Sequence, residues 1–143
     1  MNLVVSTALD WVGTPYVHQA SCRGAGCDCL GLIRGVWREI YGSEPVAVPP
    51  YTRDWNEPQG DEKLLHEARG LLIERDVRAI EPGRVLLFRM HGASVAKHLG
   101  IATSAGDMPR FVHAYQGRGV CETTLSAPWR RRIAAVFDFP TEA

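Results

Sequence analysis

The chain has 143 residues, and its 16 lysines and arginines balance 16 aspartates and glutamates, so the formal net charge is zero. It therefore lacks the basic excess of a nucleic-acid-binding protein, and no apolar run approaches the ~20 residues needed to span a membrane. Hydrophobic residues make up 45% of the chain, which is enough for one core, and we expect a single domain over residues 1–143.

The N-terminal stretch lacks the basic region and the long apolar region of a secretory leader, because Asp10 interrupts it. We therefore expect the protein to be made in the cytoplasm without a signal peptide. Apolar residues from Val4 to Val12 recur at helical spacing and predict a short amphipathic helix that ends at Gly13. Residues 17–27 are polar and rich in glycine, which favours a loop.

A second helix is predicted to begin at Cys29 and to end at Tyr41, with Asp28 as its N-cap and Gly42 after its last turn. This position places the cysteine in the first helical turn, facing the apolar side. The partial positive charge of a helix N-terminus favours a thiolate there. Gly31 and Gly35 lie inside the helix and predict close packing against another backbone.

The middle of the chain contains a proline-rich stretch and a third helical pattern. Residues 43–60 are expected to form an ordered surface loop that is anchored by Tyr51 and Trp55. Leucines and alanine at helical spacing between Asp61 and Arg75 predict an amphipathic helix.

The C-terminal half has the character of consecutive strands, so the fold class predicted is α+β, with N-terminal helices packed on an antiparallel β-sheet. Arg130, Arg131 and Arg132 are expected to form a solvated patch. The expected strands are Val85–Phe88, His98–Thr103, Phe111–Tyr115, Val120–Leu125 and Ile133–Phe139.

Two histidines of this sheet are candidates for partners of the thiol. His98 lies on the small-residue side of its strand, where Gly100 and Ala102 are expected to leave room for a helix N-terminus. His113 falls within a residue or two of the position opposite His98, and cross-strand neighbours lie ~5 Å apart. Cys29, His98 and His113 thus predict a nucleophile, a base and an orienting group. His91 is the rival for the base, whereas His18 and His66 are lesser candidates.

Less specific explanations of the same residues stay open at this point. A cysteine at a helix start is often a small core residue, and a histidine on a strand is often only a satisfied interior group. Zinc binding is an alternative, although the C-x4-C-x-C spacing differs from paired C-x2-C ligands. We expect no metal and no cofactor. The zinc alternative involves Cys22, Cys27, Cys29 and Cys121.

Five ordered motifs resemble the NlpC family of cell-wall cysteine peptidases, whose core is papain-like. Three further elements are similar to the branch found in tailed phages and gene transfer agents. The family motifs are Gly13-Thr14-Pro15-Tyr16, Asp28-Cys29-x-Gly31-Leu32, Pro82-Gly83-x-Val85-Leu86-x-Phe88, His98-x-Gly100-Ile101 and Phe111-x-His113-Ala114. The branch elements are Cys27-Asp28-Cys29-Leu30-Gly31-Leu32, Gly35-Val36-Trp37-Arg38 and Pro50-Tyr51-x-x-Asp54-Trp55.

The resemblance implies a role for each matched residue. It makes Cys29 the nucleophile, His98 the base and His113 the third member of the triad. Tyr16 corresponds to a tyrosine whose hydroxyl stands near the nucleophile and the oxyanion. Arg23 and Asp28 lie beside the nucleophile in the sequence and are our candidates for binding substrate.

The implied function is hydrolysis of an amide bond in the peptidoglycan stem peptide, between D-glutamate and the diamino acid. The expected partners are that peptide and the tail-hub or baseplate proteins of a phage-like particle, with no direct nucleic-acid contact. The enzyme would be carried on the particle tail and act in the periplasm or cell wall. The alternatives are a catalytically silent structural protein of the tail, and a thiol acyltransferase or amidase with a non-wall substrate.

Overall fold

The structure is a computed structural model that describes residues 2–52, 61–91 and 94–140. None of its described helices is long and apolar enough to cross a membrane. The helices are α1 (Leu3–Leu9), α2 (Cys29–Tyr41), α3 (Lys63–Leu71) and α4 (Ala127–Arg131). The strands are β1 (Ser21–Cys22), β2 (Gly26–Cys27), β3 (Ile73–Arg75), β4 (Val85–Arg89), β5 (Ala96–Ala102), β6 (Arg110–Tyr115), β7 (Gly119–Thr124) and β8 (Ile133–Asp138).

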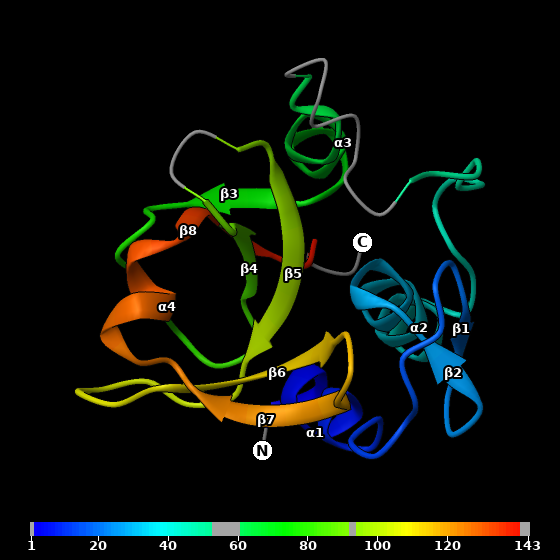
Figure 1. The fold of residues 1–143 in the computed structure, drawn as a ribbon, viewed down its shortest axis with the longest axis horizontal. Coiled ribbons are helices and arrows are strands. Elements are labelled where there is room, and N and C mark those ends of the chain that lie inside the picture. The colour runs from blue at the N-terminus through cyan, green and yellow to red at the C-terminus, as the bar shows by residue number, and fades with distance from the viewer. Residues whose placement is uncertain (1, 53–60, 92–93, 141–143) are drawn as a thin grey trace.

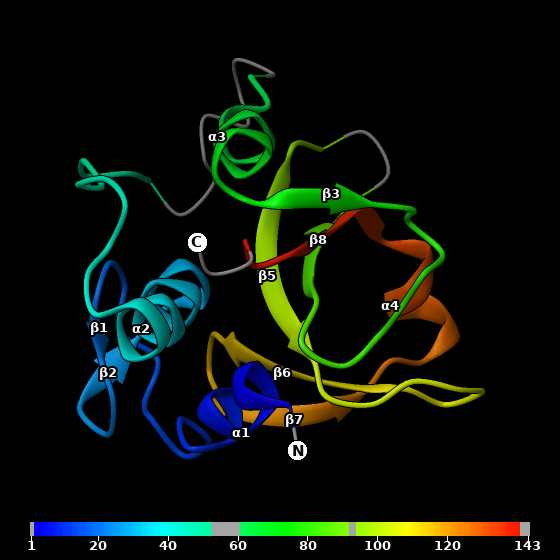
Figure 2. The ribbon, with the colours of Figure 1, turned by 180° about the vertical axis from the view of Figure 1, so that it is seen from behind.

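Six strands form one antiparallel sheet in the order β3-β8-β4-β5-β6-β7. The sheet is strongly curved, so that β6 and β7 cross the direction of β4 and β5 (Figure 1). Helix α2 lies beside β5 on one side, and α4 lies on the opposite side of the molecule; the view from behind shows the same arrangement (Figure 2). The predicted α+β class with an antiparallel sheet is confirmed.

Alternation along the strands divides the interior into two apolar clusters, because successive side chains point to opposite faces of the sheet. On β4, Val85 and Leu87 join the cluster that contains the apolar face of α2. Leu86 and Phe88 join the second cluster, against which Trp129 of α4 packs. The sheet therefore carries a helix on each face, and the α2 face holds the larger core.

Several parts of the predicted secondary structure differ from the structure. The first helix, which was expected to end at Gly13, ends at Leu9 and is followed by a turn. Residues 17–27 contain a small hairpin, in which β1 pairs with β2, rather than only loop. The helix expected over Asp61–Arg75 spans only Lys63–Leu71, and the chain then turns into β3 at the sheet edge. Helix α4 was missed because its five residues are too few to show a periodicity. Trp55 and Asp54, which the sequence singled out, lie outside the described residues.

Helix α2 has the bounds and the caps that the sequence predicts. The Asp28 carboxylate accepts a hydrogen bond from the Gly31 amide at 2.7 Å, and Gly42 ends the helix with a φ of 92°. A Cβ at Gly31 would lie 1.9 Å from the Ala20 carbonyl oxygen, so that glycine permits a close backbone approach, as predicted. Gly35 instead faces a side chain, the indole ring of Trp11.

Candidate active site

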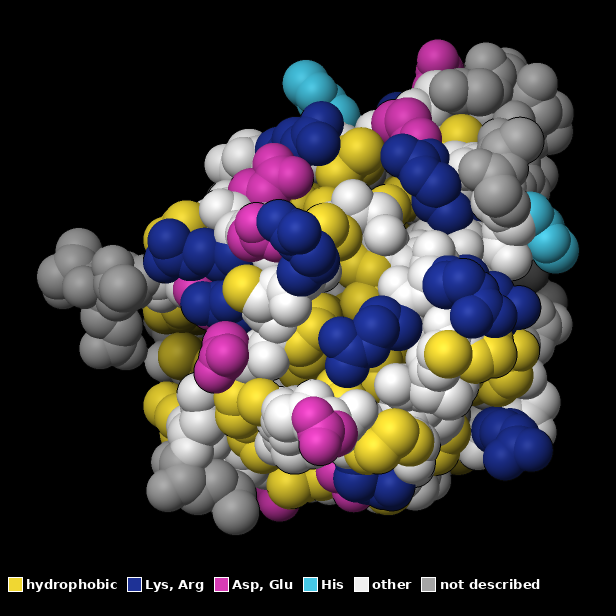
Figure 3. Space-filling model, turned by 90° about the vertical axis from the view of Figure 1, so that its left-hand side faces the viewer, with side chains coloured by type: hydrophobic (Ala, Val, Ile, Leu, Met, Phe, Trp, Pro, Cys, Tyr) yellow, Lys and Arg dark blue, Asp and Glu magenta, His cyan; other side chains and the backbone are white. Residues whose placement is uncertain are grey.

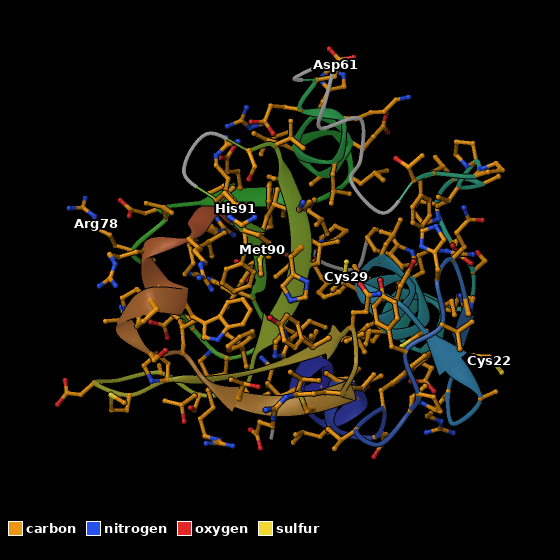
Figure 4. The ribbon with its side chains drawn as sticks, in the orientation of Figure 1. Cys22, Cys29, Asp61, Arg78, Met90 and His91 are labelled. Atoms are coloured by element: carbon orange, nitrogen blue, oxygen red, sulfur yellow. The ribbon has the colours of Figure 1, made fainter. Side chains whose placement is uncertain are left out.

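The N-terminus of α2 meets β5 and β6 at a cleft of about 150 Å³. Cys29, Met90 and β5 lie together near the centre of the molecule (Figure 4). The cleft brings together four of the six residues that the sequence assigned to the site, which are Tyr16, Asp28, Cys29 and His98. Its full lining is Tyr16, His18, Asp28, Cys29, Tyr51, Met90, Lys97, His98, Ala114, Tyr115 and Gln116.

The sulfur of Cys29 lies against the backbone that carries His98. Its thiol donates to the carbonyl of Lys97 at 3.6 Å, and the backbone N–H of Leu99 contacts the sulfur. The Lys97 carbonyl and the Leu99 N–H lie on the edge of β5 that faces β6. The β5–β6 pairing, however, is formed at Ile101 and Ala102, at the C-terminal end of β5. The Cys29 sulfur thus contacts backbone groups that β6 would otherwise pair with. This contact holds the start of α2 next to His98.

His98 is the first member of a buried hydrogen-bonded chain. Its Nε2 lies 2.8 Å from Nδ1 of His113, whose Nε2 lies 2.9 Å from Oγ1 of Thr123. One proton arrangement has His98 donating to His113 and His113 donating to Thr123, which leaves Nδ1 of His98 as an acceptor. The opposite arrangement would protonate that nitrogen and disable it as a base. The direction of the chain therefore decides whether His98 can accept a proton.

Gly100 explains how two histidines that are not directly opposite can meet. The register places Gly100 opposite His113, so the bond from His113 to His98 runs diagonally, within the predicted two residues. The predicted reason for the small residue is wrong, however. A Cβ at Gly100 would lie 2.8 Å from the Phe111 ring, so the space belongs to Phe111 and not to the helix N-terminus.

Asp28 lines the cleft and is buried, with only 2% of the residue exposed. Besides capping α2, it accepts hydrogen bonds from the backbone N–H of Gln19 at 2.7 Å and from the Tyr51 hydroxyl. His18 Nδ1 lies 3.7 Å from the same oxygen. Because the Asp28 oxygens accept hydrogen bonds from Gln19, Gly31 and Tyr51, the carboxylate holds the segments around the cleft in place.

The titration of the site differs from the prediction of a thiolate. Burial, followed by the negative charge of Asp28, raises the pKa of Cys29 to about 12, although backbone N–H groups of Leu99 and Leu30 oppose that shift. Burial and the neighbouring His113 lower the pKa of His98 to about 3. Burial and Arg118 lower the pKa of His113 to about 4. The resting site thus holds a neutral thiol beside two neutral imidazoles, because burial of the sulfur, with the charge of Asp28 as a second cause, outweighs the backbone N–H groups that favour a thiolate.

Alkylation of Cys29 should reveal this raised pKa. In a Cys22→Ser protein, which removes the exposed thiol, we expect carboxamidomethylation of Cys29 to be slow at neutral pH. The rate should rise continuously above pH 9, because the thiolate forms only as the pH approaches the raised pKa of about 12. Peptide mass analysis after timed quenching gives the rate at each pH. A constant rate between about pH 5 and pH 8 would indicate a preformed thiolate and contradict this description.

Thr123 is expected to position the histidine chain. Thr123→Val removes the acceptor for His113 at nearly constant volume, so His98 more often carries its proton on the wrong nitrogen. We expect kcat to fall about tenfold with KM nearly unchanged. Thr123→Ser keeps the hydroxyl and should restore kcat. Equal losses in the valine and serine variants would assign Thr123 a packing role only.

Arg23 is the one substrate-binding candidate that the structure does not bring to the cleft. Its guanidinium lies 3.8 Å from Asp10 and 3.7 Å from Glu39. Glu39 is ten residues along α2 from Cys29, or about 15 Å at 1.5 Å per residue. Proximity in sequence was misleading here, because the β1–β2 hairpin directs Arg23 away from the helix start.

Of the remaining histidines and cysteines, only His18 lines the cleft. His91 and His66 are exposed and do not line the cleft, whereas His18 does. All four cysteines are free thiols, and Cys22 lies at the hairpin, away from Cys29 (Figure 4). In the described part of the chain, no three histidine, cysteine or acidic side chains are grouped to hold a metal ion. The four cysteines do not form the zinc site considered as an alternative.

Thr123 and Tyr51 contribute to the site without having been predicted to do so. Thr123 lies on β7 at an alternating position, and only the register of β6 with β7 brings it to His113. Tyr51 was expected as a loop anchor, and it reaches the site through Asp28. No local pattern in the sequence signals either contact.

No protein-family model and no curated protein matches this sequence. Several solved structures resemble the fold, including the following three. The NlpC/p60 domain of peptidoglycan hydrolase SagA is 22% identical with a TM-score of 0.66, and the match covers 97% of this chain and 100% of that one. An NLP/P60-family protein similar to a lipoprotein, from Staphylococcus aureus, is 20% identical with a TM-score of 0.60, over 98% of this chain.

The third structure, Ly7917, is 13% identical with a TM-score of 0.61, over 98% of this chain. This chain spans 41% of the staphylococcal protein and 63% of Ly7917. These likenesses confirm the predicted fold, which is that of NlpC/p60 domains. The branch of tailed phages and gene transfer agents stays a prediction.

Proposed function

We propose that this protein is a cysteine peptidase that hydrolyses an amide bond in the stem peptide of peptidoglycan. The observation that carries the proposal is the Cys29 sulfur, held against β5 beside His98, with His98 hydrogen-bonded to His113. A nucleophile, a base and an orienting group in this order form the arrangement used for acyl transfer. The fold shared with a domain of a peptidoglycan hydrolase supports the choice of substrate.

Acylation begins from the neutral pair. As Sγ of Cys29 attacks the amide carbon, its proton passes to Nδ1 of His98, so thiolate and imidazolium form only during the step. His113 stabilises the imidazolium by accepting from Nε2 of His98. His98 then gives the proton to the leaving amine, and the acyl group stays on Cys29 as a thioester.

Deacylation uses the same groups in reverse. His98 takes a proton from water, the hydroxide attacks the thioester carbon, and the Cys29 thiol is released with a carboxylic acid product. The oxyanion of both steps forms beside the first turn of α2, where the Cys29 N–H serves as a donor. Tyr16 lines the cleft and is our candidate for a second donor.

The proposed bond joins D-glutamate to the diamino acid, as the sequence resemblance implies. Digestion of purified sacculi followed by mass analysis of the soluble fragments tests this directly. We expect fragments that end in D-glutamate and matching fragments with a new amine on the diamino acid. Intact sacculi would contradict a wall hydrolase, and cleavage at another position would contradict the assigned bond.

We further propose that the enzyme is carried on the tail of a phage-like particle and opens the wall locally for DNA delivery. Support for this role comes from the three sequence elements similar to the phage and gene-transfer-agent branch. A copy held at the tail tip would act at high local concentration over a small patch of wall. Particles carrying Cys29→Ala should deliver DNA poorly. Wild-type delivery by those particles, or purified particles without the protein, would contradict the role.

A further inference from the structure

In the part of the chain that the structure describes, three consecutive arginines at the end of α4 have no carboxylate partner, unlike most of the other arginines. In the described residues, Arg130, Arg131 and Arg132 form no ion pair, in a chain with no net charge. Basic side chains are spread over the face that carries α4, with acidic side chains between several of them (Figure 3). The arginines that do pair with a carboxylate are Arg23, Arg34, Arg38, Arg69, Arg75, Arg78, Arg84, Arg89 and Arg110.

Two of these three arginines line a hollow of about 340 Å³. Arg132 stacks on Trp129, with its guanidinium 5.4 Å from the ring centroid, and Arg131 is exposed beside it. Arg89 also lines the hollow, but Glu62 neutralises its charge. The complete lining is Arg89, Met90, His91, Pro128, Arg131, Arg132 and Ile133.

The hollow adjoins the active-site cleft. Met90 lines both, and Figure 4 shows it between Cys29 and His91. Trp129, on which Arg132 stacks, also lies 5.7 Å from the ring of His98. A peptide whose amide bond lies at Cys29 can therefore extend past Met90 and place a side chain or terminus at the arginines.

We infer that this hollow binds a carboxylate of the peptide substrate through Arg131 and Arg132. A guanidinium matches the planar geometry of a carboxylate and binds it with two parallel hydrogen bonds. The stacking of Arg132 on Trp129 limits its freedom, which reduces the entropy lost on binding. This inference rests on the proposed function, since stem peptides carry several carboxylates.

Peptide binding to the inactive Cys29→Ala protein tests the inference. The probe is a soluble stem peptide with free carboxylates, compared with the same peptide after amidation. Adding Arg131→Gln should weaken binding of the free-acid peptide about ten- to a hundredfold and leave the amidated peptide unaffected. Arg130→Gln is the matched control, because Arg130 is also exposed on α4 but does not line the hollow. It should change affinity less than about twofold.

Equal effects of the two substitutions, or none from Arg131→Gln, would overturn the carboxylate site. Inorganic phosphate that displaces the peptide at comparable concentrations would also overturn it, in favour of a general anion site. Cleavage of the free-acid peptide by the wild-type protein is measured in parallel. Cleavage with no effect of Arg131→Gln contradicts only the carboxylate site, whereas carboxylate-dependent binding without cleavage contradicts only the proposed hydrolysis.

Discussion

Cys29→Ala is expected to abolish hydrolysis of sacculi and of soluble stem peptides, a loss of about 10⁴-fold or more. The sulfur is the only heavy atom removed, and in the proposed mechanism it is the atom that forms the thioester. The fold should persist, because truncation at the first turn of a capped helix costs roughly 1 kcal/mol. Released fragments give the activity, and thermal unfolding of the same preparation gives the stability.

Cys27→Ala is the matched control for this substitution. Cys27 is two residues away and fully buried, but it does not line the cleft. Its loss should leave most of the activity, while the free energy of unfolding changes by a similar small amount. An active Cys29→Ala protein, or a Cys27→Ala protein that is folded and inactive, would contradict the assignment of Cys29 as the nucleophile.

His98→Ala should be nearly as damaging, with kcat reduced about 10³- to 10⁴-fold. The raised pKa of Cys29 makes this loss large, because the thiol starts neutral and must pass its proton to a base during the attack. The leaving amine also loses its proton donor. Initial rates with the soluble peptide measure kcat, and His98→Gln repeats the test with less disturbance of the surrounding rings.

Two other histidines calibrate the result. His113→Gln should cost about tenfold, since an amide can accept from Nε2 of His98 and donate to Thr123. His91→Ala should keep a wild-type kcat, because His91 lines the neighbouring hollow and not the cleft that holds Cys29. An inactive His91→Ala protein together with an active His98→Ala protein would make His91 the base.

The sequence was most informative where local patterns and the fold agree. The bounds of α2 follow from Asp28, the apolar stripe and Gly42, and each is a local signal. The pairing of His98 with His113 could be predicted because the alternation along two strands joined by a turn limits their register. The pairing of these two histidines could therefore be predicted from contacts within a single hairpin.

The sequence could not predict properties that depend on packing between distant segments. The pKa of Cys29 depends on its burial against β5 and on a carboxylate fixed in place by Tyr51 and Gln19. Arg23 lies close to Cys29 along the chain and far from it in the fold. Helix α4 is too short to show a helical pattern, and its arginines alone predict only a solvated patch. Its proposed role in substrate binding became visible only from the hollow that it lines beside the cleft.

Interception of the thioester by hydroxylamine tests the central claim most directly. A stem peptide is incubated with the protein and increasing hydroxylamine, and the acyl half is identified by mass. We predict that the wild-type protein converts part of the acyl half to the hydroxamate, because the amine of hydroxylamine competes with water for the Cys29 thioester, and that Cys29→Ala forms none. Cleavage that gives only the free acid at every hydroxylamine concentration, or hydroxamate formed by Cys29→Ala, would contradict covalent catalysis by Cys29.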